Sequence, residues 1–336
     1  MHKKGSFLIV TLWITAILVL FTLGLAHRAS LNLKIARNQK NRLKAYNLAK
    51  AGINKAAMHA YHDSLDSETK DYDTVLECGV NLKNKDLPEI FSENLAESDE
   101  GFRVGFHKNN GEFTYGMSDE ESKINVASVG LAAVLEDRKV EDGAELAQTI
   151  HSWISQESSL DTLGSNQIPK KGPLHAPEEL ILILEYFFSS KNILHAKAKA
   201  GQEYEKFKDF ITIYGDHKIN VNTAAAETIE ILIRAISLEN NLEIEAAKLA
   251  WRIIELRDAP QRKYYKDLDE LQTDMEQDQS LDDQEKGFFT GFLLPFLKCK
   301  SEYLKIESKG YVGNTIKQIT VVYDRNKQKA VYWHEN

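Results

Sequence analysis

Histidines and cysteines are among the residues that could carry catalysis or bind a metal, and in this chain their spacing favours neither. A metal site on one helix face needs two histidines four residues apart, and five histidines in the body of the chain lack that spacing. They are His107, His151, His175, His195 and His217. No Gly-x-Ser-x-Gly, P-loop or Cys-x-x-Cys motif occurs. The sequence therefore predicts a protein that is not an enzyme, with these histidines scattered over its surface.

The two cysteines, Cys78 and Cys299, lie far apart in the sequence and belong to no motif. They could form a disulfide in an oxidising compartment, but spacing alone does not decide between a disulfide and two free thiols.

A different kind of chemistry is suggested by Lys3-Lys4-Gly5, which directly precedes an apolar run. Residues 6–26 include no charge, and a helix of that length spans about 30 Å, enough to cross a membrane. A cleaved secretory signal would have a shorter apolar core and a small-x-small cleavage site, which residues 25–28 do not offer. A simple one-pass anchor remains an alternative. Because the residues after the span are also basic, the charge pattern does not fix its orientation.

The helical pattern continues beyond the membrane segment through residues 27–62, which include no Pro and a single Gly, Gly52. A polar neck at residues 37–42 is followed by an apolar stripe at spacings of three and four. The stripe consists of Leu43, Tyr46, Ala49, Ile53, Ala56 and Ala60. We expect one continuous helix whose second half packs on a globular head.

Alternating apolar residues predict strands on both sides of a helical middle. Residues 101–107 and 111–117 flank an Asn-Asn-Gly turn and predict a β-hairpin. Residues 302–308, 315–323 and 330–333 alternate in the same way, whereas residues 63–98 predict a loop with short helices. Strands that flank a helical region from about Lys123 to Lys300 indicate an α+β fold with an insertion.

The helical middle includes a weak repeat. Lys123-Ile124-Asn125-Val126 returns 95 residues later as Lys218-Ile219-Asn220-Val221, and each copy leads to a helix with a tryptophan, Trp153 or Trp251. We expect Asn125 and Asn220 to cap the helices that follow them. The second copy resembles a helix-hairpin-helix DNA module, but its turn at residues 237–243 is acidic and lacks Gly. With a net charge of −8, this predicts no nucleic-acid partner.

Several segments in this order are similar to general secretion pathway protein K, the minor pseudopilin K family of type II secretion systems. They are Lys3-Lys4-Gly5 with the apolar helix, Arg37-Asn38, residues 48–53, Asp119-Glu120 before the first repeat, residues 173–180, residues 218–224 and residues 332–335. The similarity extends over nearly the whole chain, and the paired Ile-Asn-Val segments are its most discriminating feature.

The resemblance implies a type IV pilin-like fold. Its parts would be a leader at residues 1–5, a transmembrane helix at 6–26 and a periplasmic continuation at 27–62. A pilin-like α/β domain would comprise residues 63–122 and 301–336, with an inserted helical domain at 123–300 built of two SAM-like, helix-hairpin-helix-like repeats. The resemblance also implies that a prepilin peptidase cuts between Gly5 and Ser6 and methylates Ser6. The product would be a single-pass protein of a bacterial inner membrane, with a cytoplasmic N-terminus and a periplasmic head.

In this family the implied function is that of a non-enzymatic subunit at the tip of the pseudopilus, which starts and caps a filament that exports folded proteins. The implied partners are minor pseudopilins I and J, major pseudopilin G, the prepilin peptidase and the inner-membrane assembly platform. The expected partner-binding residues are Val10, Leu43, Tyr46, Ala49, Ile53 and Ala56. The alternatives are a minor pilin of a type IV pilus or a DNA-uptake machine, and a membrane-anchored binding domain that never assembles.

Position 10 departs from the usual pilin pattern, because most pilin-like subunits have Glu there. A carboxylate inside the membrane is costly unless it is paired, and the resemblance implies pairing with the N-terminal amine of a neighbouring subunit. Val10 cannot form that pair, which favours a subunit with nothing above it. An anchor that never enters a filament would also have no need of the Glu.

A second departure concerns calcium, which some family members hold in the loop after the first repeat. The family often has Asp-Trp-x-Asp there, but this chain has Ser152 and Ser155 around Trp153. Calcium takes six to eight oxygen ligands, and the available carboxylates are Glu157, Asp161, Glu178 and Glu179. We expect a solvated acidic loop and no cofactor, with calcium as the alternative.

Overall fold

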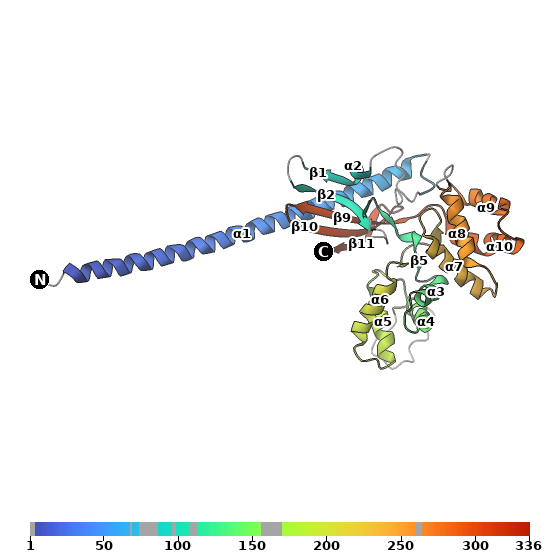
Figure 1. Ribbon diagram of the computed structural model, residues 1–336, viewed down its shortest axis with the longest axis horizontal. Coiled ribbons are helices and arrows are strands. Elements are labelled where there is room, and N and C mark those ends of the chain that lie inside the picture. Colours follow the sequence, from blue (N-terminus) through green and yellow to red (C-terminus); the bar gives the residue numbers. More distant parts are fainter. Residues whose placement is uncertain are drawn as a thin grey trace.

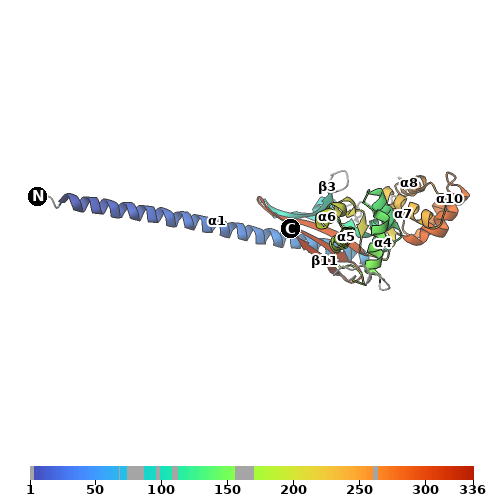
Figure 2. The same ribbon diagram turned by 90° about the horizontal axis from the view of Figure 1, so that it is seen from below.

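The computed structural model describes residues 4–67, 69–73, 87–95, 99–107, 113–155, 170–259 and 264–336, with residues 4–6 and 88 described by their backbone alone. In this part of the chain a long helix leads from the N-terminus to a head. A β-sheet lies beside the end of the helix, and a group of shorter helices lies farther from the N-terminus (Figure 1). Figures 1 and 2 both show that the N-terminal half of the helix stands clear of the head.

Helix α1 (Lys4–Leu65) is one uninterrupted helix of 62 residues, about 90 Å long at 1.5 Å per residue. The prediction of a single helix that passes from the apolar segment through the polar neck into the head is confirmed. The helix ends three residues beyond the predicted limit of residue 62, and Asp63 in its last turn is buried in the head.

The sheet that packs on α1 is antiparallel. Its strand order is β1 (Ser92–Asn94), β2 (Glu100–His107), β9 (Tyr303–Val312), β10 (Thr315–Asp324) and β11 (Lys329–Glu335). Strand β3 (Phe113–Tyr115) pairs with β2 and β4 (Ser118–Asp119) pairs with β9, while the short helix α2 (Leu87–Phe91) precedes β1. The predicted strands are confirmed, including the hairpin of β2 and β3, although its turn lies outside the described residues.

Alternate residues of β9 and β10 face α1 and form the core of this layer. Leu304, Ile306, Ile319 and Val321 are buried there together with the alanines of the helix. Gly310 lies where helix and strand approach most closely, because a Cβ at this position would collide with the carbonyl oxygen of Ala45. The absence of a side chain at this position therefore lets α1 lie directly on β9.

The helical insertion lies between β4 and β9 in the chain. Its C-terminal half lies at the end of the head farthest from the N-terminus, and its N-terminal half lies to one side of the sheet (Figure 1). Its helices are α3 (Gly130–Asp137), α4 (Gly143–Ile154), α5 (Glu179–Ser190), α6 (Ala196–Phe207), α7 (Ala226–Glu239), α8 (Ala246–Arg257), α9 (Leu268–Gln277) and α10 (Asp283–Phe288). Short turns occur at η1 (Glu120–Ser122), η3 (Phe289–Leu293) and η4 (Leu294–Phe296). The insertion buries a core of its own, separate from the core between α1 and the sheet. The two cores and the sheet order confirm the predicted α+β, pilin-like fold.

Each of the two repeats begins with one short strand and ends with another, and the two strands pair with each other in parallel. Strand β5 (Ile124–Asn125) pairs with β6 (Ile211–Thr212), and β7 (Ile219–Asn220) pairs with β8 (Leu297–Lys298). The pairs close two consecutive helical lobes, and this gives the repeated Ile-Asn segments a structural role. The two tryptophans differ, because Trp153 is 9% exposed in the insertion core and Trp251 is 67% exposed on α8.

The prediction that Asn125 and Asn220 cap helices is wrong. Helices α3 and α7 begin later, and their N-cap residues, Val129 and Ala225, make no side-chain cap. The Oδ1 atoms of Asn125 and Asn220 accept the backbone N–H of the residue two positions on. Each asparagine therefore shapes the turn after its short strand, in a gap between strand and helix that the sequence pattern did not show.

Candidate functional site

The N-terminal half of α1 has the character of a membrane-spanning segment. Its most apolar stretch is long enough to cross a membrane and is not buried by any described part of the chain. Thr11, Thr15 and Thr22 donate their hydroxyls to backbone carbonyls one turn earlier, so these polar groups do not need water. Val10 is 51% exposed on this surface. The peptide between Gly5 and Ser6 lies in the first turn of the described helix, whose side chains are not described before Phe7.

The expected partner-binding stripe of α1 is mostly occupied by the chain itself. Ala49, Ile53 and Ala56 are buried against the sheet, so the structure leaves them no exposed surface for another subunit. The interpretation of these three residues as partner-binding is therefore corrected. Their periodicity marks an apolar helix face, but it does not distinguish a face covered by the chain itself from a face covered by another subunit. Tyr46 is half-buried and donates its hydroxyl to Glu335 at 3.1 Å, while Leu43 is 63% exposed.

The opposite side of α1 presents a second face in the head region, which we call the outer face. Its exposed residues recur at spacings of three and four: Leu43, Asn47, Lys50, Asn54, Met58, Tyr61 and Leu65. Four of the seven are apolar or aromatic and remain uncovered by the described residues. Of the six expected partner-binding residues, Leu43 belongs to this face.

A buried ionic cluster, which we call the junction cluster, joins the sheet to the insertion. The guanidinium of Arg325, at the end of β10, donates to Asp63 at the end of α1 and to Asp73, at 2.8 Å from the latter. Asp73 also accepts the backbone N–H of Ser301 at 2.6 Å and the amide of Asn220 at 3.1 Å. Sequence reasoning missed this cluster. Its partners are up to 262 residues apart in the sequence, so no local pattern connects them. The one available signal is the position of Arg325, a charged residue directly after a strand that the sequence predicts to be partly buried.

Asp119 extends the junction cluster toward the second repeat. Its carboxyl accepts the hydroxyls of Ser301 and Thr223 and the backbone N–H of Glu121. Burial, followed by the charges of Asp73 and Glu121, raises the pKa of Asp119 to about 7. Beside it, Glu121 pairs with Lys298 of β8 at 2.5 Å, with both side chains almost fully covered. The cluster thus fixes the start of the insertion to its end.

Two of the calcium candidates already have partners. Glu179 accepts the backbone N–H groups of His175 and Ala176 and pairs with Lys170 at 2.6 Å, and these contacts lower its pKa against the effect of burial. Glu178 accepts the hydroxyl of Tyr332 at 2.6 Å. Glu157 and Asp161 lie outside the described residues. Within the described part, no three or more His, Cys, Asp or Glu side chains are arranged so that they could hold a metal ion.

The histidines and Cys299 lie apart from one another. His107, His175, His195 and His217 are exposed, whereas His151 is half-buried and burial lowers its pKa. Cys299 is buried, and burial raises the pKa of its thiol to about 12, so the thiol is unreactive. Cys78 lies outside the described residues.

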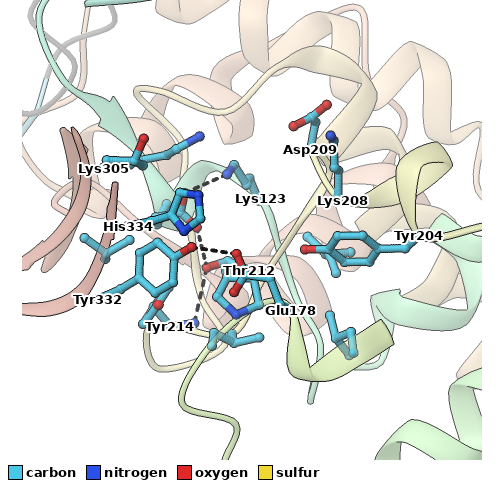
Figure 3. Close-up of a pocket in the computed structure, with 17 residues that line it drawn as sticks. Lys123, Glu178, Tyr204, Lys208, Asp209, Thr212, Tyr214, Lys305, Tyr332 and His334 are labelled. Carbon is cyan, nitrogen blue, oxygen red and sulfur yellow. Dashed lines mark hydrogen bonds and ion pairs between the residues drawn. The ribbon is translucent and has the colours of Figure 1, made fainter. Parts of the chain in front are cut away.

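A cavity of about 210 Å³ lies between the sheet and the first helical lobe (Figure 3). Tyr332 and His334 of β11 line one side, and Tyr204 of α6 faces them from the other. Glu178 and Tyr214 complete the polar lining together with Lys123, Thr212, Lys208, Asp209, Lys305 and Glu120. The sequence resemblance gave no hint of this cavity.

A helix of this length that packs on an antiparallel sheet defines a pilin-like α+β fold. Neither a protein-family model nor a curated protein matches the chain. Among solved structures, the chain is similar to a chain of the GspK-GspI-GspJ complex from the type 2 secretion system of enterotoxigenic Escherichia coli, with a TM-score of 0.58 and 13% sequence identity. The similarity covers 90% of this chain and 99% of that chain. The chain therefore has the fold of a pseudopilin.

Proposed function

We propose that this protein is a non-enzymatic minor pseudopilin at the tip of a type II secretion pseudopilus, where it starts and caps the filament with other minor pseudopilins. The observation that carries the proposal is the fold similarity to the minor pseudopilin complex, which extends over 90% of the chain and so includes the helical insertion. A membrane anchor with an unrelated binding domain would have no reason to share this arrangement of helix, sheet and insertion.

The outer face of α1 is the surface we propose for neighbouring subunits. It is exposed, partly apolar and continuous with the membrane-spanning half of the same helix. By analogy with the similar complex, the partners would be minor pseudopilins I and J. The sequence resemblance adds the major pseudopilin G and the assembly platform of the inner membrane as proposed partners. Val10 and Leu43 would contribute to these contacts.

Two features of the proposed subunit support the tip position. Val10 cannot neutralise the N-terminal amine of a subunit above, and an unpaired charge inside the membrane is costly. Helices α7–α10 of the insertion lie beyond the far end of α1 (Figure 1), in the space that a subunit stacked above would need. Replacement Val10→Glu should therefore not let the protein enter the filament shaft. Its incorporation along the shaft in large numbers would overturn the tip position.

Processing would precede assembly. The prepilin peptidase would cut between Gly5 and Ser6 at the cytoplasmic surface and methylate Ser6, leaving the head in the periplasm. Mass spectrometry of the protein from cells with and without the peptidase tests this step. A mature N-terminus at Met1 in competent cells would contradict it, and Gly5→Val should block cleavage.

The function itself is tested by deletion of the gene, followed by assays of exoprotein release and of DNA uptake. Loss of release, restored by the wild-type gene, is the expected result. Normal release with lost DNA uptake would instead favour a minor pilin of a DNA-uptake machine or type IV pilus. We propose no nucleic-acid partner and no cofactor. The alternative, a calcium ion near Glu178 and Glu179, is tested by calcium-binding measurements.

A further inference from the structure

We propose that the cavity between the sheet and helices α5 and α6 binds an organic cation, either an alkylammonium or a guanidinium group. The inference is independent of the proposed function, because it rests on the lining of the cavity alone. The same chemistry is offered by a lysine or arginine side chain of another protein and by a free amine.

The cavity includes a hydrogen-bonding group that the chain leaves unused. Tyr214 is 9% exposed, and its hydroxyl has no hydrogen-bond partner among the described residues. A buried hydroxyl without a partner is destabilising, so native structures rarely leave one unsatisfied. An N–H donor from a bound molecule would satisfy the oxygen of Tyr214.

The charges around the cavity favour a cation over an anion. Each lysine of the lining is already neutralised: Lys123 by Glu120 at 2.7 Å, Lys208 by Glu205 at 2.5 Å and Lys305 by Glu307 at 2.7 Å. Glu178 and Asp209 also line the cavity, and neither forms an ion pair within the described part of the chain. Among the described residues, two carboxylates of the lining therefore have no cationic partner, whereas each lysine ammonium has an anionic one.

The aromatic residues add to the same preference. Tyr204, Tyr214 and Tyr332 line the cavity, and the face of an aromatic ring attracts a cation. Burial raises the pKa of each of these hydroxyls, and the charge of Glu178 raises it further. The hydrogen bond from Tyr332 to Glu178, drawn as a dashed line in Figure 3, holds ring and carboxylate together at the cavity.

The size of the cavity limits the guest. A volume of about 210 Å³ is below the range of about 300–1,000 Å³ that is typical for cofactors and drug-sized ligands. It is sufficient for one side chain with its charged end group. The cavity also borders β11, the edge strand of the main sheet, so a guest chain could reach it without opening the fold.

The test uses the full-length protein in a neutral maltoside detergent and saturation-transfer NMR with small probes. The probes are butylammonium, butylguanidinium and N-acetyl-lysine methylamide, compared with choline, butanol, acetate and calcium chloride. We expect the three cations with N–H donors to bind, choline, which has no N–H donor, to bind more weakly, and butanol, acetate and calcium not to bind. Stronger binding of the lysine derivative than of butylammonium would indicate a protein side chain as the natural guest, and the reverse would indicate a free amine. Binding of acetate or calcium in preference to the cations would overturn the proposal.

Variants connect binding to the cavity. Glu178→Gln should weaken cation binding about tenfold, because it replaces a charge-assisted hydrogen bond by a neutral one. Tyr214→Phe, which keeps the ring and removes the unused hydroxyl, should weaken it about threefold. The matched control Glu255→Gln, at an exposed position of α8 outside the cavity lining, should leave binding unchanged. Equal binding by all three variants would contradict the assignment, and Tyr214→Phe decides the matter if Glu178→Gln does not fold.

Discussion

The sheet of this protein is attached to the rest of the molecule in two chemically different ways. Helix α1 lies on it through a dry contact of small residues, in which Ala45, Ala49 and Gly310 let the backbones approach. The insertion is joined to it through the junction cluster, where Arg325 and three aspartates are buried together. The first contact depends on shape and loses stability when volume or charge is added. The second depends on complementary charge and responds to pH.

The largest effect is expected at the dry contact. Ala49→Asp would bury an unpaired carboxylate in the core between α1 and the sheet, which should cost at least about 4 kcal/mol of unfolding free energy. The matched control is Ala51→Asp, two residues along the same helix but exposed, which should stay within about 0.5 kcal/mol of wild type. Urea unfolding in detergent, followed by circular dichroism, measures both. Equal stability of the two variants would mean that α1 is not packed on the sheet as described.

A slightly smaller loss is expected at the junction cluster. Arg325→Met would leave Asp63 and Asp73 buried without their cation, at a cost of about 3–5 kcal/mol. The control Arg234→Met removes an arginine from the looser, partly exposed pairs with Asp137 and Glu230 and should cost less than about 1 kcal/mol. The same unfolding assay applies. A loss below about 1 kcal/mol for Arg325→Met would show that the cluster is not important for stability.

The two attachments also differ in how far the sequence predicted them. The periodicity of Ala49, Ile53 and Ala56 indicated a buried helix face, because residues three and four apart share one side of a helix. It could not say whether the chain itself or another subunit covers that face. The junction cluster combines Asp63, Asp73 and Arg325, which no local pattern connects. The cavity next to Glu178 and Tyr214 depends in the same way on elements distant in sequence, so resemblance and periodicity predicted the fold but not these sites.

A smaller, pH-dependent effect separates the two attachments most clearly. The pKa of Asp119 is raised to about 7 by burial and by Asp73 and Glu121, above its ordinary value of 3.8. The folded protein therefore retains a proton between about pH 4 and pH 7 that the unfolded chain has lost. The stability contributed by protonated Asp119 is complete below about pH 4 and is lost as the pH rises to about 7.

This predicts a difference between wild type and Asp119→Asn, in which the side chain is always neutral. Between pH 4 and pH 7 the unfolding free energy of the wild type should fall relative to the variant by up to about 1.4 kcal/mol per pH unit. Urea unfolding across this range gives the difference. Parallel pH profiles for the two proteins would exclude a protonated Asp119. A change at the dry contact that keeps Asp119, for example Ile53→Val, should instead lower the unfolding free energy by the same amount at every pH in this range.

The smallest effect on stability is expected on the outer face of α1, where function should respond instead. Leu43 and Met58 are exposed, so Leu43→Ser and Met58→Ser should each change the unfolding free energy by less than about 0.5 kcal/mol. If this face binds other minor pseudopilins, the double variant should lose most of the complex in co-purification while keeping a folded head. A complex that survives the double variant would move the interface elsewhere.

Site-specific photo-cross-linking in cells tests the central claim most directly, that the outer face of α1 joins the filament while the insertion stays free at its tip. A cross-linker at Leu43 or Met58 should capture other pseudopilins. One at Leu182, exposed on α5 of the insertion, should capture no filament subunit. Adducts with filament subunits from Leu182, together with none from Leu43 and Met58, would contradict the claim.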